Sequence, residues 1–234
     1  VYCASSAQCD PDYHRSAFRL GELLADAGCT TVYGGGGMGS MGALADGALS
    51  RQGHVIGIIP RFMTEVEWQH PGLATLDIVE DMRERKHRLL TGSDAVVALP
   101  GGCGTLEEVF EAITLKRLGL YLKPIVFVNT RGYYDGLRDF LQHTIRERMM
   151  GEAHAAIWQF VDTVEDVLPV AGGQCLRHAF VALPIQRTLI ALDLRHRLAQ
   201  RQRLLRVEPM LARLGGDPAA LLFGARLDHA VVQP

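Results

Sequence analysis

Several features that define other classes of protein are missing from this 234-residue sequence. No hydrophobic run approaches the roughly 20 apolar residues of a membrane-spanning helix, so no contact with a membrane is expected. The five cysteines are scattered, odd in number and without the spacing of metal ligands, which favours a reducing environment and predicts a cytoplasmic protein with no metal site. The formal net charge of −2 argues against a general nucleic-acid-binding protein.

The charged residues are unevenly distributed along the chain. Residues 1–174 carry 15 basic and 22 acidic residues, whereas residues 175–234 carry nine arginines, no lysine and four acidic residues. This contrast predicts an α/β domain over residues 1–172 and an Arg-rich, helical extension over residues 173–234. Leucines and arginines over residues 185–207 predict an amphipathic helix that docks on another subunit, covers the sheet or contacts an acidic surface; a poorly ordered surface extension is the alternative.

In the first part, short apolar and β-branched runs alternate with segments of helical periodicity. Strands are predicted at the start of residues 1–6 and over residues 30–33, 54–59, 76–79, 94–99, 125–128 and 157–161. Helices are predicted over residues 11–27, 38–51, 82–91, 105–118, 134–148 and 163–170. This alternation predicts a Rossmann-like α/β fold with a doubly wound, mostly parallel sheet and helices on both faces. Because Val1 lies almost inside a strand, we expect a trimmed N-terminus, and no signal peptide is visible.

One stretch, residues 99–108, joins a buried strand to a helix through a glycine turn. Pro100 ends the strand because it has no N–H to donate, and the glycines that follow let a ligand approach the main chain. Thr105 with Glu108 three residues later predicts a capping box at the start of the helix. A helix N-terminus behind such a turn attracts an anion through its free N–H groups and its dipole.

A second glycine run, within residues 34–42, again joins a strand to a helix. Neither run is a Walker A loop, because no Gly-Lys-Ser/Thr follows. Two such junctions predict a ligand with a phosphate and a second polar part. The phosphate-loop candidates in this run are Gly35, Gly36, Gly37 and Gly39. In parallel sheets the ligand binds at the carboxyl ends of the strands, where both junctions, Ser5 and the loop with Glu67 are expected.

These motifs resemble the LONELY GUY (LOG) family of cytokinin riboside 5′-monophosphate phosphoribohydrolases, which are often mislabelled lysine decarboxylases. The resemblance rests on Arg85-Lys86 and on residues 100–108, which look like the family's "RK" and "PGGxGTxxE" signatures, and it covers about residues 1–170. It implies a Rossmann-like homodimer or higher homo-oligomer without a cofactor. The implied reaction hydrolyses the N-glycosidic bond of adenosine 5′-monophosphates, plain or N6-modified, to free base and ribose 5-phosphate.

The same resemblance implies roles for individual residues. Arg85 and Glu108 match the catalytic pair of the family. The implied substrate contacts are Glu67, Lys86, Gly102, Cys103, Gly104, Thr105, Leu106, Glu107 and Thr114. Two departures are visible: Cys103 fills the variable position of the glycine motif, and Arg83 stands where histidine is common.

For the central candidates, the chemistry competes with a structural interpretation. A carboxylate such as Glu108 can stabilise the positive, oxocarbenium-like state of N-glycosidic cleavage or activate water, or it can simply cap the helix. Arg85 and Lys86 can bind phosphate or stabilise the departing base, or they can form a solvated helix face. By its place on the helix, Glu107 is expected to be structural.

The remaining candidates have weaker signals. Glu67 could orient the ribose or the base or be an ordinary loop acid, and Thr114 could carry an outward hydroxyl without function. Cys103 precedes a helix N-terminus, as a nucleophile would, but without a histidine partner we expect an inert, partly buried thiol. His70 and His87 are isolated, which predicts structural hydrogen bonds rather than a metal site.

Two other functions compete with the hydrolase. A Rossmann-like module that binds a nucleotide without hydrolysis, as a carrier or sensor, would use the same glycine turns. An amino-acid decarboxylase would need a lysine placed for pyridoxal phosphate, and Lys86, Lys116 and Lys123 are the three lysines of the chain, none suitably placed. For an oligomer, the helices over residues 105–118 and 134–148 could supply the interface.

Overall fold

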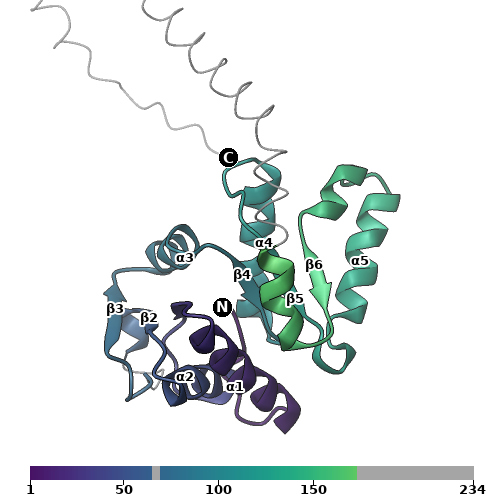
Figure 1. Cartoon of the computed structure of the whole chain (residues 1–234). Helices are drawn as coiled ribbons and strands as arrows, with labels where there is room; N and C mark the ends of the chain where they lie inside the picture. Colours follow the sequence, from purple (N-terminus) through teal and green to yellow (C-terminus); the bar gives the residue numbers. More distant parts are fainter. Residues whose placement is uncertain (65–68, 173–234) are drawn as a thin grey trace, which may run out of the picture. The chain divides into compact units, whose positions relative to one another are not determined.

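A computed structural model describes residues 1–64 and 69–172 (Figure 1). The predicted extension over residues 173–234, its amphipathic helix and Glu67 lie outside the described residues. Within the described ranges, no helix combines the length and the apolar character needed to span a bilayer.

The described chain alternates strands and helices as predicted. The strands are β1 (Thr31–Tyr33), β2 (Val55–Pro60), β3 (Thr75–Val79), β4 (Val96–Ala98), β5 (Ile125–Val128) and β6 (Gln159–Val161). The α-helices are α1 (Pro11–Asp26), α2 (Gly39–Ser50), α3 (Met82–Thr91), α4 (Cys103–Arg117) and α5 (Asp135–Arg146), with 3-10 turns η1 (Arg61–Met63), η2 (Thr130–Gly132), η3 (Glu152–Ala156) and η4 (Val164–Asp166). Residues 167–172 are helical again.

Each half of the sheet is parallel, with strand orders β1-β2-β3 and β4-β5-β6. The segment before α1 lies between the halves. The Val1 nitrogen donates to the Val32 carbonyl (2.6 Å), the Tyr2 N–H donates to the Val97 carbonyl (2.9 Å), and the Leu99 N–H donates to the Tyr2 carbonyl (2.9 Å). The predicted first strand is therefore a single bridge, and the parallel, doubly wound arrangement is confirmed.

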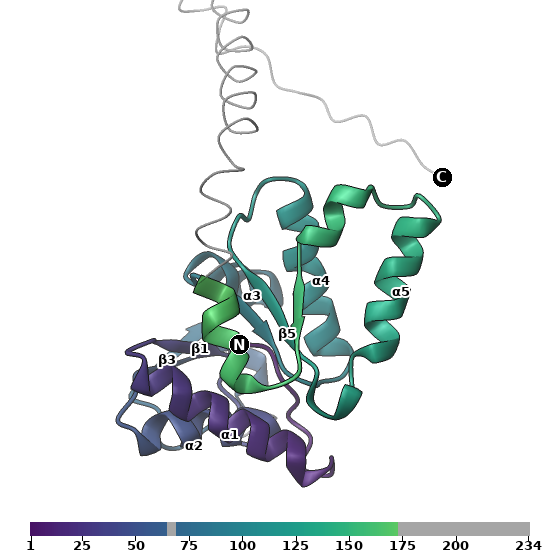
Figure 2. The same cartoon turned by 45° about the vertical axis from the view of Figure 1, so that its right-hand side comes forward.

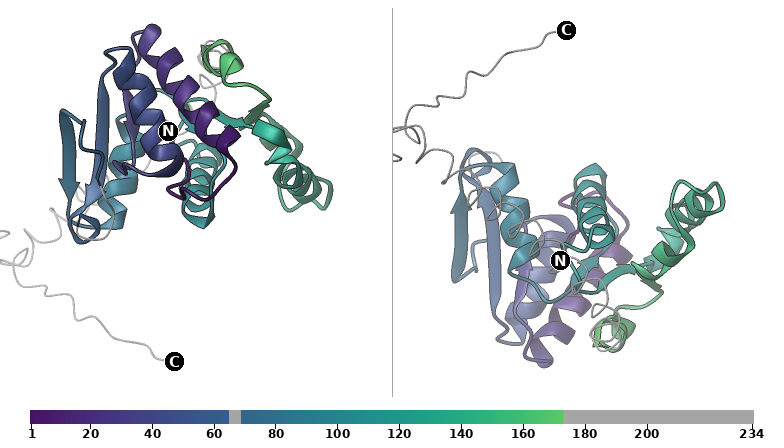
Figure 3. Two further views of the ribbon diagram at one scale, coloured as in Figure 1. Left: turned by 90° about the horizontal axis from the view of Figure 1, so that it is seen from below. Right: turned by 90° about the horizontal axis from the view of Figure 1, so that it is seen from above.

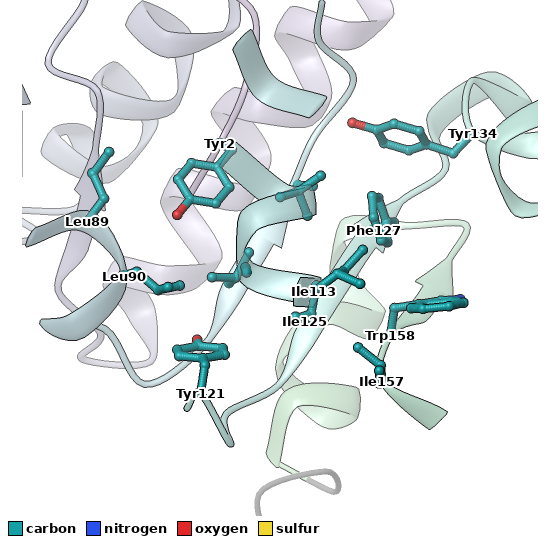
Figure 4. Packing of buried hydrophobic residues seen from close by; sticks show 14 of the residues in the cluster. Tyr2, Leu89, Leu90, Ile113, Tyr121, Ile125, Phe127, Tyr134, Ile157 and Trp158 are labelled. Carbon is teal, nitrogen blue, oxygen red and sulfur yellow. The ribbon is translucent and has the colours of Figure 1, made fainter. Parts of the chain in front are cut away.

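Helices cover both faces of the sheet because successive strand residues point to opposite sides. Val96 and Phe127 pack with α3, α4 and α5 in one core cluster. Figure 4 labels the buried aromatic residues of this cluster together with several of its aliphatic residues. Val97 and Val126 pack on the other side with α1, α2 and residues 167–172. The helices α1 and α2 lie side by side (Figures 2 and 3), and a Cβ on Gly21 would clash with the backbone of α2.

The direction in which successive strands are added to the sheet reverses between residues 1–3 and β4. The strands β1, β2 and β3 extend to one side of residues 1–3, and β4, β5 and β6 extend to the other. Such a switch point leaves a crevice at the carboxyl ends of the two central strands, because the loops that follow them diverge. Here those loops are residues 4–6 and residues 99–102.

Candidate active site

A pocket of about 390 Å³ lies at this switch point. It is lined by Val1, Tyr2, Cys3, Ala4, Ser5, Ser6, Gly34, Met41, Met63, Met82, Arg85, Gly102, Gly104, Thr105 and Glu108. The pocket thus brings together the two residues expected to form a catalytic pair, although they are 23 positions apart in the sequence. It also contains Ser5, which was predicted at this edge.

The Arg85 side chain is buried, at 6% exposure, and is oriented by backbone carbonyls. Its Nε donates to the Ile58 carbonyl (3.1 Å) and its Nη2 to the Gly34 carbonyl (3.3 Å). Its Nη1 lies 3.8 Å from the sulfur of Met63 and 3.9 Å from that of Met82. In the described part of the chain no carboxylate forms an ion pair with Arg85, and its guanidinium is oriented by the two carbonyls.

Glu108 lies in the second turn of α4, and the predicted capping box is wrong. The extended backbone of Gly102 (φ −83°, ψ −157°) starts the helix at Cys103, two residues earlier than predicted, and no side chain caps it. Thr105 is instead buried beneath the glycine turn. Burial raises the pKa of the Glu108 carboxyl, and the nearby Arg85 guanidinium partly offsets that rise.

The second glycine turn opens onto the pocket, whereas most of the first run packs inside the protein. A Cβ on Gly102 or Gly104 would meet nothing within 4 Å, and both glycines are exposed. Of the first run, Gly34 lines the pocket and leaves room for Arg85. The other candidates, Gly35, Gly36, Gly37 and Gly39, do not line it, and their phosphate role stays a prediction.

Lys86, Glu107 and Thr114 lie away from the pocket. Lys86 Nζ donates to Glu107 Oε1 (2.5 Å) and reaches Glu111 Oε2 (3.1 Å), and these contacts raise the pKa of Lys86. Thr114 is exposed on the same face of α4, three residues beyond Glu111. The ion pairs agree with the structural interpretation of Glu107, and the substrate contacts expected for these three residues stay predictions.

Two other residues of the glycine motif differ in environment. Cys103 is exposed as the first residue of α4, so the expectation of a partly buried thiol is wrong. Leu106 is half-buried and packs against the core on the α3–α5 side of the sheet.

The isolated histidines do not gather around a metal. The Gly72 N–H donates to His70 Nδ1 (3.1 Å), so the proton is on Nε2, which donates to Asp46 Oδ1 (3.0 Å). This bond joins the loop before β3 to α2 and confirms a structural role for His70. His87 is exposed, and no metal-ligating cluster occurs among the described residues.

Three methionines form a wall of the pocket that sequence reasoning missed. Met41 lies in the first turn of α2, Met63 ends η1, and Met82 begins α3. One signal was available: Met82 precedes Arg85 by three residues on a helix, so both side chains share a face. The others follow the carboxyl ends of β1 and β2, where pocket residues are expected in a parallel sheet.

No lysine is placed for pyridoxal phosphate in this pocket, and all three lysines of the chain are described. Lys116 Nζ donates to the Lys123 carbonyl (2.8 Å), and burial lowers the pKa of Lys116 to about 8. Lys123 pairs with Asp94 (2.9 Å), and Lys86 pairs with the acids of α4. These residues do not fit a decarboxylase that uses that cofactor.

A larger pocket, about 650 Å³, opens at the amino ends of the strands. Its lining is mainly apolar, and it contains neither of the predicted catalytic residues and no part of the second glycine turn. We therefore place the candidate site in the smaller pocket, where the ionisable pair and the open helix N-terminus meet.

Known proteins resemble the chain over this same region. The family model described as "Possible lysine decarboxylase" matches residues 41–170. The chain is 39% identical over 147 residues to cytokinin riboside 5′-monophosphate phosphoribohydrolase LOG1 of Arabidopsis thaliana, covering 63% of this chain and 69% of that protein. It is 40% identical over 148 residues to the cytokinin riboside 5′-monophosphate phosphoribohydrolase of Rhodococcoides fascians, covering 63% and 75%. A probable rice enzyme of the same name, LOGL5 of Oryza sativa subsp. japonica, is 34% identical over 192 residues, covering 82% and 76%.

Solved structures share the fold at lower identity. The molybdenum cofactor binding protein of Rippkaea orientalis aligns with a TM-score of 0.54 at 23% identity, covering 71% of this chain and 90% of that one. The Moco carrier protein of Chlamydomonas reinhardtii aligns with a TM-score of 0.56 at 19% identity, covering 74% and 93%. At these identities the likeness extends to the Rossmann-like architecture alone.

Proposed function

The chain belongs to the LONELY GUY family, and from this premise we propose that it hydrolyses the N-glycosidic bond of adenosine 5′-monophosphates, plain or N6-modified. The products are the free base and ribose 5-phosphate. One observation carries the proposal: Arg85 and Glu108 line a single pocket beside the open N-terminus of α4. The named relatives act as phosphoribohydrolases, which supports the same chemistry here.

The start of α4 suits the 5′-phosphate. Its first N–H groups have no partner within the helix, and its dipole favours an anion. Gly102 and Gly104 carry no side chain that would stand between this helix end and a ligand. A phosphate seated there lies at the end of α4 one to two turns before Glu108, which places the ribose toward the carboxylate.

Glu108 acts at C1′, the reacting carbon of the sugar. As the bond from C1′ to the base nitrogen lengthens, positive charge develops on the ribose, and a carboxylate stabilises it or takes a proton from the attacking water. The water oxygen bonds to C1′ as the water proton passes to Glu108, and the electron pair of the broken bond leaves with the base, which takes up a proton, so that one water is added across the C1′–N bond. Arg85 is a fixed cation that can stabilise charge on the departing base or bind a substrate anion.

The methionine wall supports a purine ligand. Met41, Met63 and Met82 offer flexible, polarisable thioethers, which make favourable contacts with aromatic rings and adapt to apolar groups. An adenine with an apolar N6 substituent would gain more from this wall than plain adenine does, because more apolar surface leaves water.

The test is release of ribose 5-phosphate by the purified full chain, incubated separately with AMP and with isopentenyladenosine 5′-monophosphate. We expect release from at least one nucleotide and its loss in Glu108→Gln. Glu111→Gln is the matched control, because it removes the same charge from α4 one turn away, at a residue that faces Lys86 rather than the pocket. Unchanged release by Glu108→Gln contradicts the proposal.

The alternative of a carrier or sensor predicts a different result in the same experiment. Nucleotide would bind, measured by calorimetry, and neither substrate would yield ribose 5-phosphate. The homo-oligomeric state and the cytoplasmic location stay predictions alongside the activity.

A further inference from the structure

Hydrogen bonds and ion pairs stabilise the turn between β5 and α5. Arg131 (φ 59°) and Gly132 (φ 70°) both have left-handed backbones. Asn129 stabilises the turn from within: its Oδ1 accepts from the Tyr134 N–H (2.7 Å), and its Nδ2 donates to Asp135 Oδ1 (2.9 Å). A backbone held in this conformation presents the next side chains in fixed directions.

The turn is also tied to the start of α1. Arg131 pairs with Asp12 (2.7 Å) and with Asp10 (3.3 Å). The hydroxyls of Ser16 and Thr130 are hydrogen-bonded to each other (2.9 Å). The turn is therefore fixed to a helix that follows the loop of Ser5 and Ser6, another wall of the pocket.

Two adjacent tyrosines project from this turn onto the carbonyls of the glycine turn. The Tyr134 hydroxyl donates to the Leu99 carbonyl (2.7 Å), and the Tyr133 hydroxyl donates to the Gly101 carbonyl (2.8 Å). Tyr134 is buried, at 1% exposure, and belongs to the core cluster in Figure 4. Tyr133 is 44% exposed.

The Tyr133 bond fixes the orientation of one peptide unit. In a trans peptide the carbonyl and the following N–H point in opposite directions, so holding the Gly101 carbonyl directs the Gly102 N–H away from Tyr133. Gly102 lines the pocket, and within the described residues this N–H has no acceptor. An unpaired N–H beside a helix N-terminus is available to an anionic ligand.

We propose that Tyr133 is a positioning residue for the phosphate-binding turn: through the Gly101 carbonyl it keeps the Gly102 N–H directed at the 5′-phosphate without touching the substrate. This inference rests on the proposed function. Tyr134 anchors the Leu99 carbonyl, two residues earlier, and is part of the core, whereas the Tyr133 hydroxyl contributes little to the core because its side chain is half exposed. Removing the Tyr133 hydroxyl therefore separates positioning from folding.

The experiment compares Tyr133→Phe with the unaltered full chain. We expect KM for the nucleotide and the inhibition constant of ribose 5-phosphate to rise together, about five- to tenfold, as for loss of one charge-assisted hydrogen bond. We expect kcat, the inhibition constant of free adenine and the thermal midpoint to stay unchanged. A purely structural role would lower the thermal midpoint or weaken adenine and ribose 5-phosphate alike.

Tyr13→Phe is the matched control. The Tyr13 ring packs edge-on against Tyr133 at 5.6 Å, and its hydroxyl has no hydrogen bond within the described residues. This variant should leave both constants unchanged. An unchanged inhibition constant for ribose 5-phosphate in Tyr133→Phe overturns the inference even if the enzyme is active.

Binding of ribose 5-phosphate, measured by calorimetry, distinguishes this failure from failure of the proposed function. If the unaltered chain releases no base but binds ribose 5-phosphate, a weaker affinity in Tyr133→Phe still supports positioning. If the unaltered chain neither releases base nor binds ribose 5-phosphate, both proposals are overturned.

Discussion

The two strand–glycine–helix junctions of this protein have similar sequences and different uses. At the β1–α2 junction, the absent side chains of Gly34 and Gly39 make room for protein atoms, the Arg85 guanidinium and the Ser5–Ser6 backbone. At the β4–α4 junction, the absent side chains of Gly102 and Gly104 leave open space in front of a helix end. The glycines of the first junction allow protein atoms of the site to pack closely. Those of the second junction leave open space that a ligand can occupy.

This difference shows that a glycine count does not identify an anion site. What matters is the group that a Cβ would meet: a neighbouring backbone indicates close packing, and empty space in front of free N–H groups indicates room for a ligand. Substituting alanine at each junction therefore tests the comparison directly, because the two sets of variants should lose different properties.

The largest effect should come from Gly39→Ala. Gly39 has φ +60°, and a Cβ there would lie 2.5 Å from the Ser6 carbonyl oxygen, so both strain and a clash with backbone follow. We expect the free energy of unfolding to fall by about 3 kcal/mol in urea denaturation. Gly136→Ala, in α5 with open space around the added methyl group, is the control and should not destabilise the protein. Equal stabilities for the two variants would break the comparison.

A smaller effect, and on catalysis, is expected of Gly34→Ala. The added methyl group would clash with Arg85 Nη2, the movable end of a side chain, so the fold survives and the guanidinium shifts. We expect kcat to fall about 10- to 100-fold, which corresponds to roughly 1.4–2.7 kcal/mol in the barrier. Steady-state release of ribose 5-phosphate measures it, with circular dichroism to show an intact fold. A kcat within twofold of the parent value would mean that Arg85 needs no fixed position.

Gly104→Ala should separate binding from stability at the other junction. Alanine has a higher helix propensity than glycine, so the free energy of unfolding should rise by about 0.5–1 kcal/mol. The methyl group would stand where we place the phosphate, and we expect KM for the nucleotide to rise about tenfold, or roughly 1.4 kcal/mol. An unchanged KM would place the ligand elsewhere, and destabilisation would mean that the added methyl group is not accommodated in open space.

The smallest effect concerns the pH dependence of activity, and it links the two junctions because Arg85, which contacts Gly34 of the first, acts on Glu108 in the helix of the second. Burial raises the pKa of this carboxyl, and Arg85, held by the first junction, partly offsets the rise. The carboxylate is the active form, so kcat/KM should fall as the pH decreases through a midpoint above the ordinary glutamate value. A kcat/KM profile with a midpoint in the ordinary range would show that Glu108 is solvated in the free enzyme.

Much of the fold could be predicted because local patterns and global architecture agree. Residues 94–99 are apolar at every position after Asp94, as a strand buried on both faces requires, and the structure assigns Val96 and Val97 to different core clusters. The start of α4 was less predictable. Thr105 and Glu108 have the spacing of a capping box, but the Gly102 backbone starts α4 earlier, and backbone angles at a glycine are not encoded in that spacing.

For the site, the sequence identified the residue types better than the directions in which their side chains point. Arg85 and Glu108 share the pocket as expected, whereas Lys86, the neighbour of Arg85, turns to the acids of α4 because adjacent helical residues point about 100° apart. The methionine wall and the Tyr133 contact depend on pairings between distant segments. Such pairings follow from the arrangement of the whole sheet and have no local signal.

The position of residues 1–3 has a consequence for how this protein folds. The segment fits between β1 and β4, and Tyr2 pairs with Val97 and Leu99 from far along the chain. Pairings between such distant segments form slowly, because the intervening chain must be ordered before they are made. We expect the two half-sheets to form first and this segment to join them late. Ser5 and Ser6 follow it directly, so the last wall of the pocket would form then, and catalytic activity would return after helical structure during refolding.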